Sequence, residues 1–391
     1  MRKKVVLLGS TGSVGRNACK VLEFHKDKFE VRAIAANTNY KTLIHQSERL
    51  GAAKTIIVHE EFFEHAKSAA SGKVSMQYGS SAMIDAVCDP GVDIVLCAIL
   101  GTGALEPVLK ALQCGKIVAL ASKEVMLTAG KLVMDTMHRF GGRIIPVDSE
   151  HSAIFQCLAA HKKEDVKSLV LTCSGGPFRT FSAAQLAEVT KEDALKHPVW
   201  SMGRKITVDS ASLMNKALEV VEAAYLFETE ADKIQTVIHP EGIIHSLAEF
   251  RDNSMVGLFS NPSMELPIQY ALTYPDVVPS EVAPLNLAEL GSLHFERIDS
   301  SVFPSIEIAR HALKIGKNMP LVMNAANDVA VKNFLEGKLK FTQIWDVVNK
   351  TMEKTAVAEL NELADINMAD EAARAKASEI VKKLGCVIKD D

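Results

Sequence analysis

The sequence predicts an α/β protein in three parts: a doubly wound parallel sheet, an α+β middle part and a small C-terminal helical bundle. Three observations predict this order. Apolar, β-branched segments alternate with helix-patterned segments through residues 1–147. Three short strand-like segments then follow one another closely between residues 234 and 259, and we expect them to form a meander. From Pro304 onward, apolar residues recur at helical spacing.

The length of 391 residues exceeds what one hydrophobic core usually holds, so several domains are expected. We predict an N-terminal domain over 1–147 that contains the doubly wound sheet, and an α+β domain over 148–274. A Pro-containing linker over 275–300 and a helical domain over 301–391 complete the chain.

Composition excludes several classes of function. The net charge is −4 and no long basic stretch occurs, which argues against nucleic acid as a partner. The longest apolar runs are far too short to span a bilayer, so no membrane association is expected. Seven cysteines without CxxC spacing, and an N-terminus without a signal peptide, predict reduced thiols in a cytoplasmic protein.

The first strand-like run, 5–8, leads into the glycine turn Gly9-Ser-Thr-Gly12-Ser-Val-Gly15 and then a helix-patterned segment. A strand, a glycine turn and a helix together form the context that binds a dinucleotide pyrophosphate in Rossmann-like sheets. The spacing is GxxGxxG rather than GxGxxG, so an ordinary glycine turn is the alternative.

The second strand, 31–36, ends in Asn37-Thr38-Asn39. Enzymes that use NAD usually carry an acidic residue near this point, which binds the ribose hydroxyl. Because no acidic residue is present, a 2′-phosphate would not be repelled, and the segment favours NADP. The alternative is a polar loop without a role in binding.

Charged residues stand where later strands of the predicted sheet end. Lys123 follows the strand 116–121, and Asp148-Ser149-Glu150 follows the strand 142–147. Ligands in doubly wound sheets bind at these carboxyl ends. If the backbone is extended, Asp148 and Glu150 point the same way and converge on one cation or reacting group. The alternative, common for such a sequence, is that Asp148 or Ser149 caps a helix.

The middle of the chain contains two further polar groups. Ser174-Gly175-Gly176 follows a strand and is equally compatible with an anion-binding nest or a simple turn. The segment of about 179–205 is polar but carries Trp200 and Met202, which suggests a lid that excludes water. The alternative is that Trp200 anchors this loop to the core.

The segment 209–219 predicts a helix whose start and one face are polar. Ser210 stands near its start, and Asn215 and Glu219 are four residues apart on one face, beside Lys216. A hydroxyl, an amide, an ammonium and a carboxylate together suit a phosphate close to a metal-bound oxygen. Each residue taken singly is also compatible with an ordinary helix surface.

These segments together resemble the 1-deoxy-D-xylulose 5-phosphate reductoisomerase family over essentially the whole chain. The motifs that carry the resemblance are Leu8-Gly9-Ser10-Thr11-Gly12-Ser13, Pro146-Val147-Asp148-Ser149-Glu150-His151, Ser174-Gly175-Gly176-Pro177-Phe178, His197-Pro198, Trp200-Ser201-Met202-Gly203-Arg204-Lys205, Val208-Asp209-Ser210-Ala211, Met214-Asn215-Lys216 and Asn324-Ala325-Ala326-Asn327.

The resemblance implies an NADPH-dependent enzyme that acts on a small phosphorylated sugar and pairs as a homodimer. It implies that 1–147 is the NADPH-binding domain and 148–274 the catalytic domain. It implies a Mg²⁺ or Mn²⁺ ion bound by Asp148, Glu150 and Glu219. The implied substrate contacts are Lys123, Ser149, Glu150, Ser174, His197, Trp200, Met202, Ser210, Asn215, Lys216 and Glu219. The implied catalytic residues are Lys123, Asp148, Glu150, Glu219 and His197. The implied cofactor contacts are Thr11, Gly12, Ser13, Val14, Asn37, Thr38, Asn39, Ser122, Glu124 and Gly203.

The sequence departs from the family pattern at three places. Thr38 stands where the family often has a lysine that meets the 2′-phosphate, and Arg32 or Lys41 could compensate. Ser122 replaces a common Asn beside Lys123, and Cys173 replaces a common Gly before the nest. None of these departures touches the expected metal ligands.

Two other functions remain open at this point. A plain NAD(P)-dependent dehydrogenase would need neither the three carboxylates nor the phosphate-binding residues. A regulatory module that senses a dinucleotide would bind the cofactor without turnover. Neither function would require Lys123, Asp148, Glu150 and Glu219 to occur together.

Overall fold

The computed structural model describes residues 1–72, 74–200 and 203–385. The chain forms two compact units. The first unit comprises Met1–Val125, Val133–Phe155 and Ser263–Ala283, and the second comprises Met126–Leu132, Gln156–Pro262 and Pro284–Asp391. The four-part division predicted from the sequence is finer than these two units and stays a prediction.

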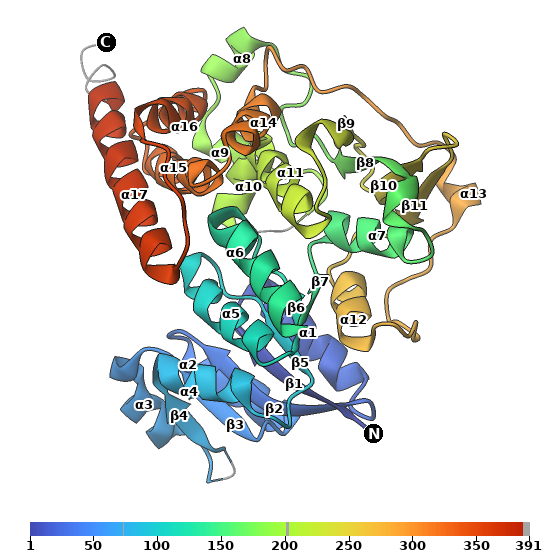
Figure 1. Ribbon diagram of the computed structural model, residues 1–391, viewed down its shortest axis with the longest axis vertical. Helices are drawn as coiled ribbons and strands as arrows, with labels where there is room; N and C mark the ends of the chain where they lie inside the picture. Colours follow the sequence, from blue (N-terminus) through green and yellow to red (C-terminus); the bar gives the residue numbers. More distant parts are fainter. Residues whose placement is uncertain (73, 201–202, 386–391) are drawn as a thin grey trace. The chain divides into compact units, whose positions relative to one another are not determined.

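The first unit is built on a seven-stranded sheet with the order β4-β3-β2-β1-β5-β6-β7, in which all paired strands are parallel (Figure 1). The strands are β1 (Lys3–Leu8), β2 (Phe29–Ala36), β3 (Lys54–Ile57), β4 (Met76–Tyr78), β5 (Ile94–Cys97), β6 (Ile117–Leu120) and β7 (Arg143–Pro146). The strand order reverses between β1 and β5, which is where doubly wound sheets bind their ligands. The predicted doubly wound sheet is therefore confirmed.

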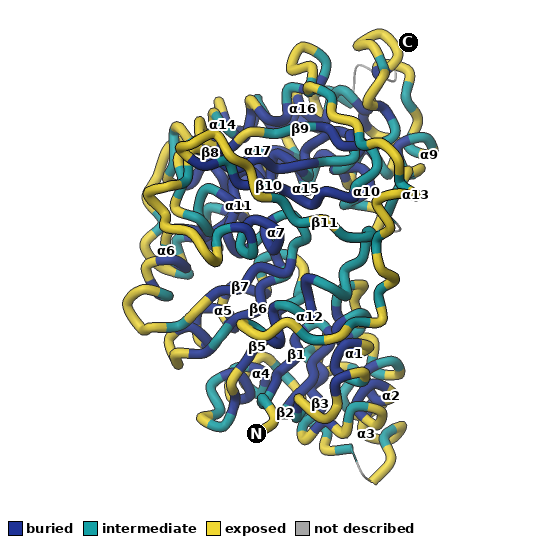
Figure 2. The backbone as a smooth tube through the Cα atoms, turned by 90° about the vertical axis from the view of Figure 1, so that its right-hand side faces the viewer, coloured by how far each residue is buried: buried dark blue, intermediate teal, exposed yellow. Residues whose placement is uncertain are grey.

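Helices pack on this sheet and bury its apolar residues (Figures 1 and 2). They are α1 (Ser13–Phe24), α2 (Tyr40–Leu50), α3 (Phe63–Ala69), α4 (Gly79–Cys88), α5 (Leu105–Gln113) and α12 (Glu265–Thr273). The most distant in sequence is α12, whose Ile268 and Leu272 lie in the same core as Leu7. Its end is held because Lys3 Nζ donates to the carbonyls of Thr273 and Tyr274, over 2.9 and 2.8 Å.

The second unit contains a four-stranded sheet with the order β11-β10-β8-β9. The strands are β8 (Val166–Cys173), β9 (Ile234–Ile238), β10 (Ile244–Phe250) and β11 (Met255–Phe259). The three predicted strands between 234 and 259 therefore exist, but the meander that they were expected to form is wrong. Central β8 pairs in parallel with β9 and antiparallel with β10, because its side chains from 168 to 172 are buried and take the middle of the sheet.

Helices make up the rest of the second unit, including the predicted C-terminal bundle (Figure 1). They are α8 (Ala183–Ala187), α9 (Lys191–Ala194), α10 (Arg204–Ala211), α11 (Met214–Leu226), α13 (Leu287–Leu290), α14 (Ser305–Ile315), α15 (Met319–Leu335), α16 (Gln343–Lys354) and α17 (Leu363–Gly385). In the bundle, Phe341 packs against Phe334 and Trp345 with ring centroids 5.6 Å apart in both pairs.

Two helices contribute residues to both units: α6 (Glu124–Phe140) and α7 (Ser149–Leu158). The backbone of α6 is interrupted at Ala129, whose φ of −144° is not helical. Within the part of the chain that the structure describes, no helix is both long and apolar enough to cross a membrane.

Candidate active site

The glycine turn after β1 is packed too closely for larger residues. Gly9 has a φ of +82°, and a Cβ on Gly15 would lie 2.2 Å from the Gly9 carbonyl oxygen. Helix α1 then begins with neither a side-chain cap nor an acidic residue in its first turn. Its first backbone N–H groups therefore remain available to an anion. Thr11, Gly12, Ser13 and Val14 all lie in this turn.

The segment after β2 has a structural role of its own. The Asn39 side chain caps α2 by accepting a hydrogen bond from Thr42 N over 3.2 Å. Arg32 points to other partners, because it pairs with Glu30 at 3.0 Å and Asp89 at 3.8 Å. Of the two cations expected to compensate for Thr38, only Lys41 is exposed near this strand end, in the first turn of α2.

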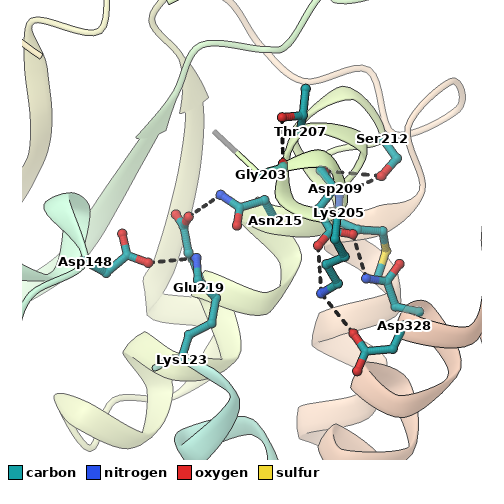
Figure 3. Close-up of polar contacts among 12 residues, drawn as sticks. Lys123, Asp148, Gly203, Lys205, Thr207, Asp209, Ser212, Asn215, Glu219 and Asp328 are labelled. Carbon is teal, nitrogen blue, oxygen red and sulfur yellow. Dashed lines mark hydrogen bonds and ion pairs between the residues drawn. The ribbon is translucent and has the colours of Figure 1, made fainter. Parts of the chain in front are cut away.

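Lys123 and Asp148 form an ion pair at the carboxyl ends of β6 and β7 (Figure 3). The Lys123 Nζ lies 2.7 Å from Asp148 Oδ2, and the side chains are 11% and 14% exposed. Nearby Ser122 is buried and donates to the backbone carbonyls of Cys97 and Ile99. Lys123 and Asp148 were expected to lie at one sheet edge, and this ion pair joins them there. Glu124 is the first residue of α6 and follows Lys123 directly.

The backbone around Glu150 differs from the extended geometry considered for it. Ser149 and Glu150 are the first residues of α7, and Ser152 N donates to Asp148 O over 2.8 Å. The argument from an extended backbone is therefore wrong here, because residues two apart point the same way only in a strand. The convergence that it predicted is nevertheless present, since carboxylate oxygens of Asp148 and Glu150 lie within 4.8 Å of each other. The start of a helix, weighed as the alternative, is what the structure has. Ser149 Oγ donates to the Glu150 carboxylate.

In the second unit, three side chains that the sequence singled out meet at one point. The Nε2 of His197 lies 3.2 Å from Ser174 Oγ and 3.0 Å from Ser210 Oγ. The glycine turn makes this approach possible, because a Cβ on Gly176, whose φ is +66°, would lie 2.8 Å from the Ser210 carbonyl oxygen. Two hydroxyls and an imidazole therefore share one small polar site.

The hydrogen bonds of His197 fix its protonation state. Its Nδ1 accepts from the backbone N–H of Val199 at 3.1 Å and of Trp200 at 2.8 Å, so this nitrogen carries no proton. Burial lowers the pKa of the imidazole, which keeps it neutral at pH 7. The proton is then on Nε2, which donates to the serine hydroxyls or to an anion that replaces them.

The single helix predicted over 209–219 is wrong, because Ser210 lies in the last turn of α10 and the helical backbone breaks at Leu213 before α11 begins at Met214. Helix α11 nevertheless presents the predicted amide, ammonium and carboxylate. Asn215 Nδ2 and Lys216 Nζ both donate to the Glu219 carboxylate (Figure 3 shows the amide contact). Lys216 and Glu219 are only 2% and 1% exposed. A buried carboxylate with such partners is held in one orientation.

The corner between α10 and α11 is anchored by the C-terminal helices. Ser305 Oγ on α14 donates to Ser212 O over 2.6 Å, and Trp345 Nε1 on α16 donates to the same Ser305 Oγ over 2.7 Å. Leu213 takes a φ of +58° at this corner. The C-terminal helices therefore position the segment that carries Ser210 and Asn215, in addition to burying apolar surface.

The predicted lid of about 179–205 is more ordered than its polarity suggests. It contains α8 and α9, which begin with capping boxes formed by Ser182 with Gln185 and by Thr190 with Asp193. Trp200 is half-buried, and Gly203 immediately precedes α10. Met202 lies outside the described residues.

A buried polar contact between α10 and α15 was not predicted from the sequence. Asp209 is 1% exposed, pairs with Lys205 Nζ at 2.8 Å and accepts from Asn327 Nδ2 at 2.7 Å. The available signal was Asn327 itself, a polar residue surrounded on α15 by buried apolar neighbours. It drew no attention as a site residue because its partner is 118 residues away in the chain.

Three family models match the chain. Residues 5–130 match 1-deoxy-D-xylulose 5-phosphate reductoisomerase, and residues 144–227 and 259–376 match two C-terminal domains of that enzyme. A relative from Geotalea uraniireducens (strain Rf4) with the same name is 45% identical over 97% of this chain and 98% of its own. The chain belongs to the 1-deoxy-D-xylulose 5-phosphate reductoisomerase family. A further member, from Geobacillus sp. (strain WCH70), is 41% identical over 95% of this chain and 98% of its own.

Solved structures of reductoisomerases have the same fold. The enzyme from Zymomonas mobilis in complex with NADPH is 37% identical, covers 98% of this chain and 100% of its own, and has a TM-score of 0.94. A reductoisomerase in complex with NADPH, fosmidomycin and magnesium is 32% identical, with coverage of 97% and 98% and a TM-score of 0.90.

Proposed function

We infer that the chain is an NADPH-dependent reductoisomerase that converts 1-deoxy-D-xylulose 5-phosphate to 2-C-methyl-D-erythritol 4-phosphate in non-mevalonate isoprenoid biosynthesis. The observation that carries this is the 45% identity to a named reductoisomerase across nearly the full length of both chains. The reaction rearranges a carbon skeleton and then reduces the resulting aldehyde. The chain must therefore anchor a phosphate, hold adjacent substrate oxygens and bind a hydride donor.

NADPH is the cofactor, and relatives of known structure bind it. We propose that its pyrophosphate meets the start of α1, where the N–H groups are available. The proposed contacts are Thr11, Gly12, Ser13, Val14, Asn37, Thr38, Asn39, Ser122, Glu124 and Gly203. Lys41 is our candidate for charge near the 2′-phosphate. NADPH supplies the hydride that completes the reduction.

For the divalent ion, relatives contain magnesium. We propose Asp148, Glu150 and Glu219 as its ligands. Their oxygen donors suit Mg²⁺ or Mn²⁺ rather than Zn²⁺. The buried Glu219 carboxylate, held by Asn215 and Lys216, supports a fixed ligand. When bound, such an ion acts as a Lewis acid toward the substrate oxygens.

The protein's own cations offset the charge of three carboxylates. Lys123, already paired with Asp148, supplies positive charge where negative charge develops on the substrate. We propose that Ser149 and Glu150 contact the substrate's hydroxyl and carbonyl groups beside it. Trp200 and Met202 would cover the bound substrate and exclude water.

We propose that the phosphate of the substrate binds where Ser174, His197 and Ser210 meet. Their two hydroxyls and the Nε2–H of His197 are donors to one point, and Asn215 and Lys216 follow on the next helix. Because this anchor is remote from the reacting carbons, its binding energy serves to align them.

A spectrophotometric assay tests the function directly. NADPH oxidation is followed with 1-deoxy-D-xylulose 5-phosphate, with and without Mg²⁺, and again with NADH. We expect turnover that depends on the substrate and on Mg²⁺ and that prefers NADPH. Turnover that survives chelation by EDTA would instead indicate a plain dehydrogenase, and NADPH binding without turnover would indicate a sensing module.

We also propose that the chain works as a homodimer in the cytoplasm. We place the contact between the two copies at strand β11, which is at the edge of its sheet and exposes Met255 (51%) and Phe259 (46%). An apolar edge strand favours pairing with another chain. Light scattering after size exclusion should give a dimer mass for the wild type. A Met255→Lys/Phe259→Lys variant should shift toward the monomer, and an unchanged dimer would assign the interface elsewhere.

A further inference from the structure

A buried carboxylate lies directly beside the proposed phosphate ligand Ser210. The preceding residue, Asp209, is 1% exposed and has two partners, Lys205 Nζ at 2.8 Å and Asn327 Nδ2 at 2.7 Å. Loss of a partner from a buried charge is strongly unfavourable, so the carboxylate is confined to this orientation. The last turn of α10, which carries Ser210, is confined with it.

Lys205 is placed where a helix does not favour a cation. It lies in the first turn of α10, which has no acidic residue and no side-chain cap. The positive end of the helix dipole repels an ammonium there. Two carboxylates offset this repulsion, because Lys205 Nζ also lies 3.0 Å from Asp328 Oδ1 (Figure 3).

Asp328 is itself fixed by the C-terminal helix. Arg374 Nη2 on α17 donates to Asp328 Oδ2 over 2.8 Å, and Arg374 Nε donates to Asp370 over 2.7 Å. A continuous series of charged contacts therefore runs from α17 through α15 to α10, all within the second unit.

We propose that Asp328 is a positioning residue for the phosphate end of the active site: through Lys205 and Asp209 it holds α10 so that Ser210 presents its hydroxyl to the phosphate. This inference rests on the proposed function. Without the Asp328 charge, Lys205, already 35% exposed, loses one of the carboxylates that hold it at a helix start that repels it. Ser210 then samples more orientations, and phosphate binding must bear the cost of ordering it.

The test uses the full chain with NADPH and Mg²⁺, and the variant Asp328→Asn. We expect the KM for 1-deoxy-D-xylulose 5-phosphate to rise about 3- to 10-fold, a typical size for coupling through packed contacts. The kcat should stay within about twofold, as expected when only ground-state binding is lost. Inhibition by inorganic phosphate should weaken by the same factor as the KM, and Asp328→Glu should restore both values.

The matched control is Glu359→Gln, which removes the carboxylate of an exposed ion pair with Lys317 at 3.0 Å in the same unit. Its KM and phosphate inhibition should equal those of the wild type. Turnover by the wild type tests the proposed function separately, so its absence would refute that function and not this inference. In that case the inference is tested by calorimetry, which compares phosphate binding by the wild type and by Asp328→Asn.

A double-mutant cycle separates positioning from general stabilisation. If Asp328 acts through Ser210, Asp328→Asn should raise the KM little further in a Ser210→Ala background. Additive effects, or a loss of kcat with an unchanged KM, would overturn the proposal. Should Asp328→Asn fail to fold, Arg374→Gln removes the next contact and should raise the KM in the same direction. A wild-type KM and wild-type phosphate inhibition in that folded variant would refute the role.

Discussion

At the scale of single residues, hydrogen bonds decide what His197 can do. Two backbone N–H groups occupy its Nδ1, so the ring presents Nε2–H to Ser174 and Ser210 as a neutral donor. A cationic histidine would attract phosphate more strongly, but the pKa lowered by burial prevents this near pH 7. The role we assign to His197 is therefore binding and not proton transfer.

Replacement of His197 by Ala should mainly weaken substrate binding. The variant would lose the hydrogen bond from His197 Nε2–H to the charged phosphate of the substrate. We therefore expect kcat/KM to fall roughly 10- to 100-fold, mostly through an increase in the KM. Steady-state kinetics with 1-deoxy-D-xylulose 5-phosphate measure this. A kcat/KM equal to that of the wild type would exclude His197 from the phosphate site.

Replacement of Glu219 by Gln should abolish turnover and leave NADPH binding intact. The substitution keeps the side-chain volume but removes a proposed metal ligand, and we expect a loss of roughly 100-fold or more in kcat. NADPH affinity is measured by fluorescence. Glu230→Gln, in an exposed pair with Lys233, is the matched control and should behave as wild type. Wild-type turnover in Glu219→Gln would show that Glu219 is not a metal ligand.

At the scale of elements, the glycine turn after β1 shows how close packing prepares a binding site. Gly15 lies on α1 directly against the backbone of Gly9, and no side chain fits between them. This contact sets where α1 begins, and with it where its unpaired N–H groups point.

Gly15→Ala should therefore impair both folding and cofactor binding. The added Cβ meets a backbone oxygen that cannot move freely, and we expect a loss of about 1–3 kcal/mol in the free energy of unfolding. NADPH affinity should fall with it. Urea unfolding and NADPH titration measure the two effects, and Gly72→Ala, where a Cβ meets nothing within 4 Å, is the control. Equal stability in both variants would contradict the packing argument.

Elements also show where the sequence was sufficient. The apolar strands of the first sheet and the helices of the C-terminal bundle were predicted from local patterns. The extended geometry expected at Asp148-Ser149-Glu150 failed, because the helical pattern of the following residues begins at Ser149 and overrides the strand before it. The meander failed because the parallel pairing of β8 with β9 joins residues far apart in the chain, which local patterns do not report.

At the scale of the whole molecule, the chain returns to earlier elements to complete each unit. Ser263–Ala283 packs with the N-terminal sheet, although it follows the second sheet in sequence. In the second unit, the bundle supplies Asp328, Asn327 and Ser305 to the segment that carries the proposed phosphate site. On our proposal, stability and substrate binding therefore share residues in the C-terminal part.

Stability should fall as the pH drops below neutrality. Burial lowers the pKa values of both His197 and His245. These histidines therefore bind protons at a higher pH in the unfolded chain than in the folded chain. The free energy of unfolding is then fully maintained above the unfolded histidine pKa of about 6.5 and declines as the pH falls through the lower folded values. Urea midpoints at pH 7.5 and 5.5 measure this.

His245→Asn should reduce that pH dependence, because the variant lacks one buried group that resists protonation. The exposed His59→Asn variant is the control, and it should keep the wild-type dependence. An identical decline in His245→Asn and wild type would show that other groups control acid stability.

The sequence by itself determined the residue types that can bind a dinucleotide, a divalent ion and a phosphate, and the order of strands and helices that carry them. These follow from local rules: the period of apolar residues and the glycine turns. The tertiary structure alone decided the tautomer of His197 and the support of Ser210 by Asp209, Lys205 and Asp328. Such contacts join residues that are distant in the chain, and a buried charge selects its partners only when folding removes water from it.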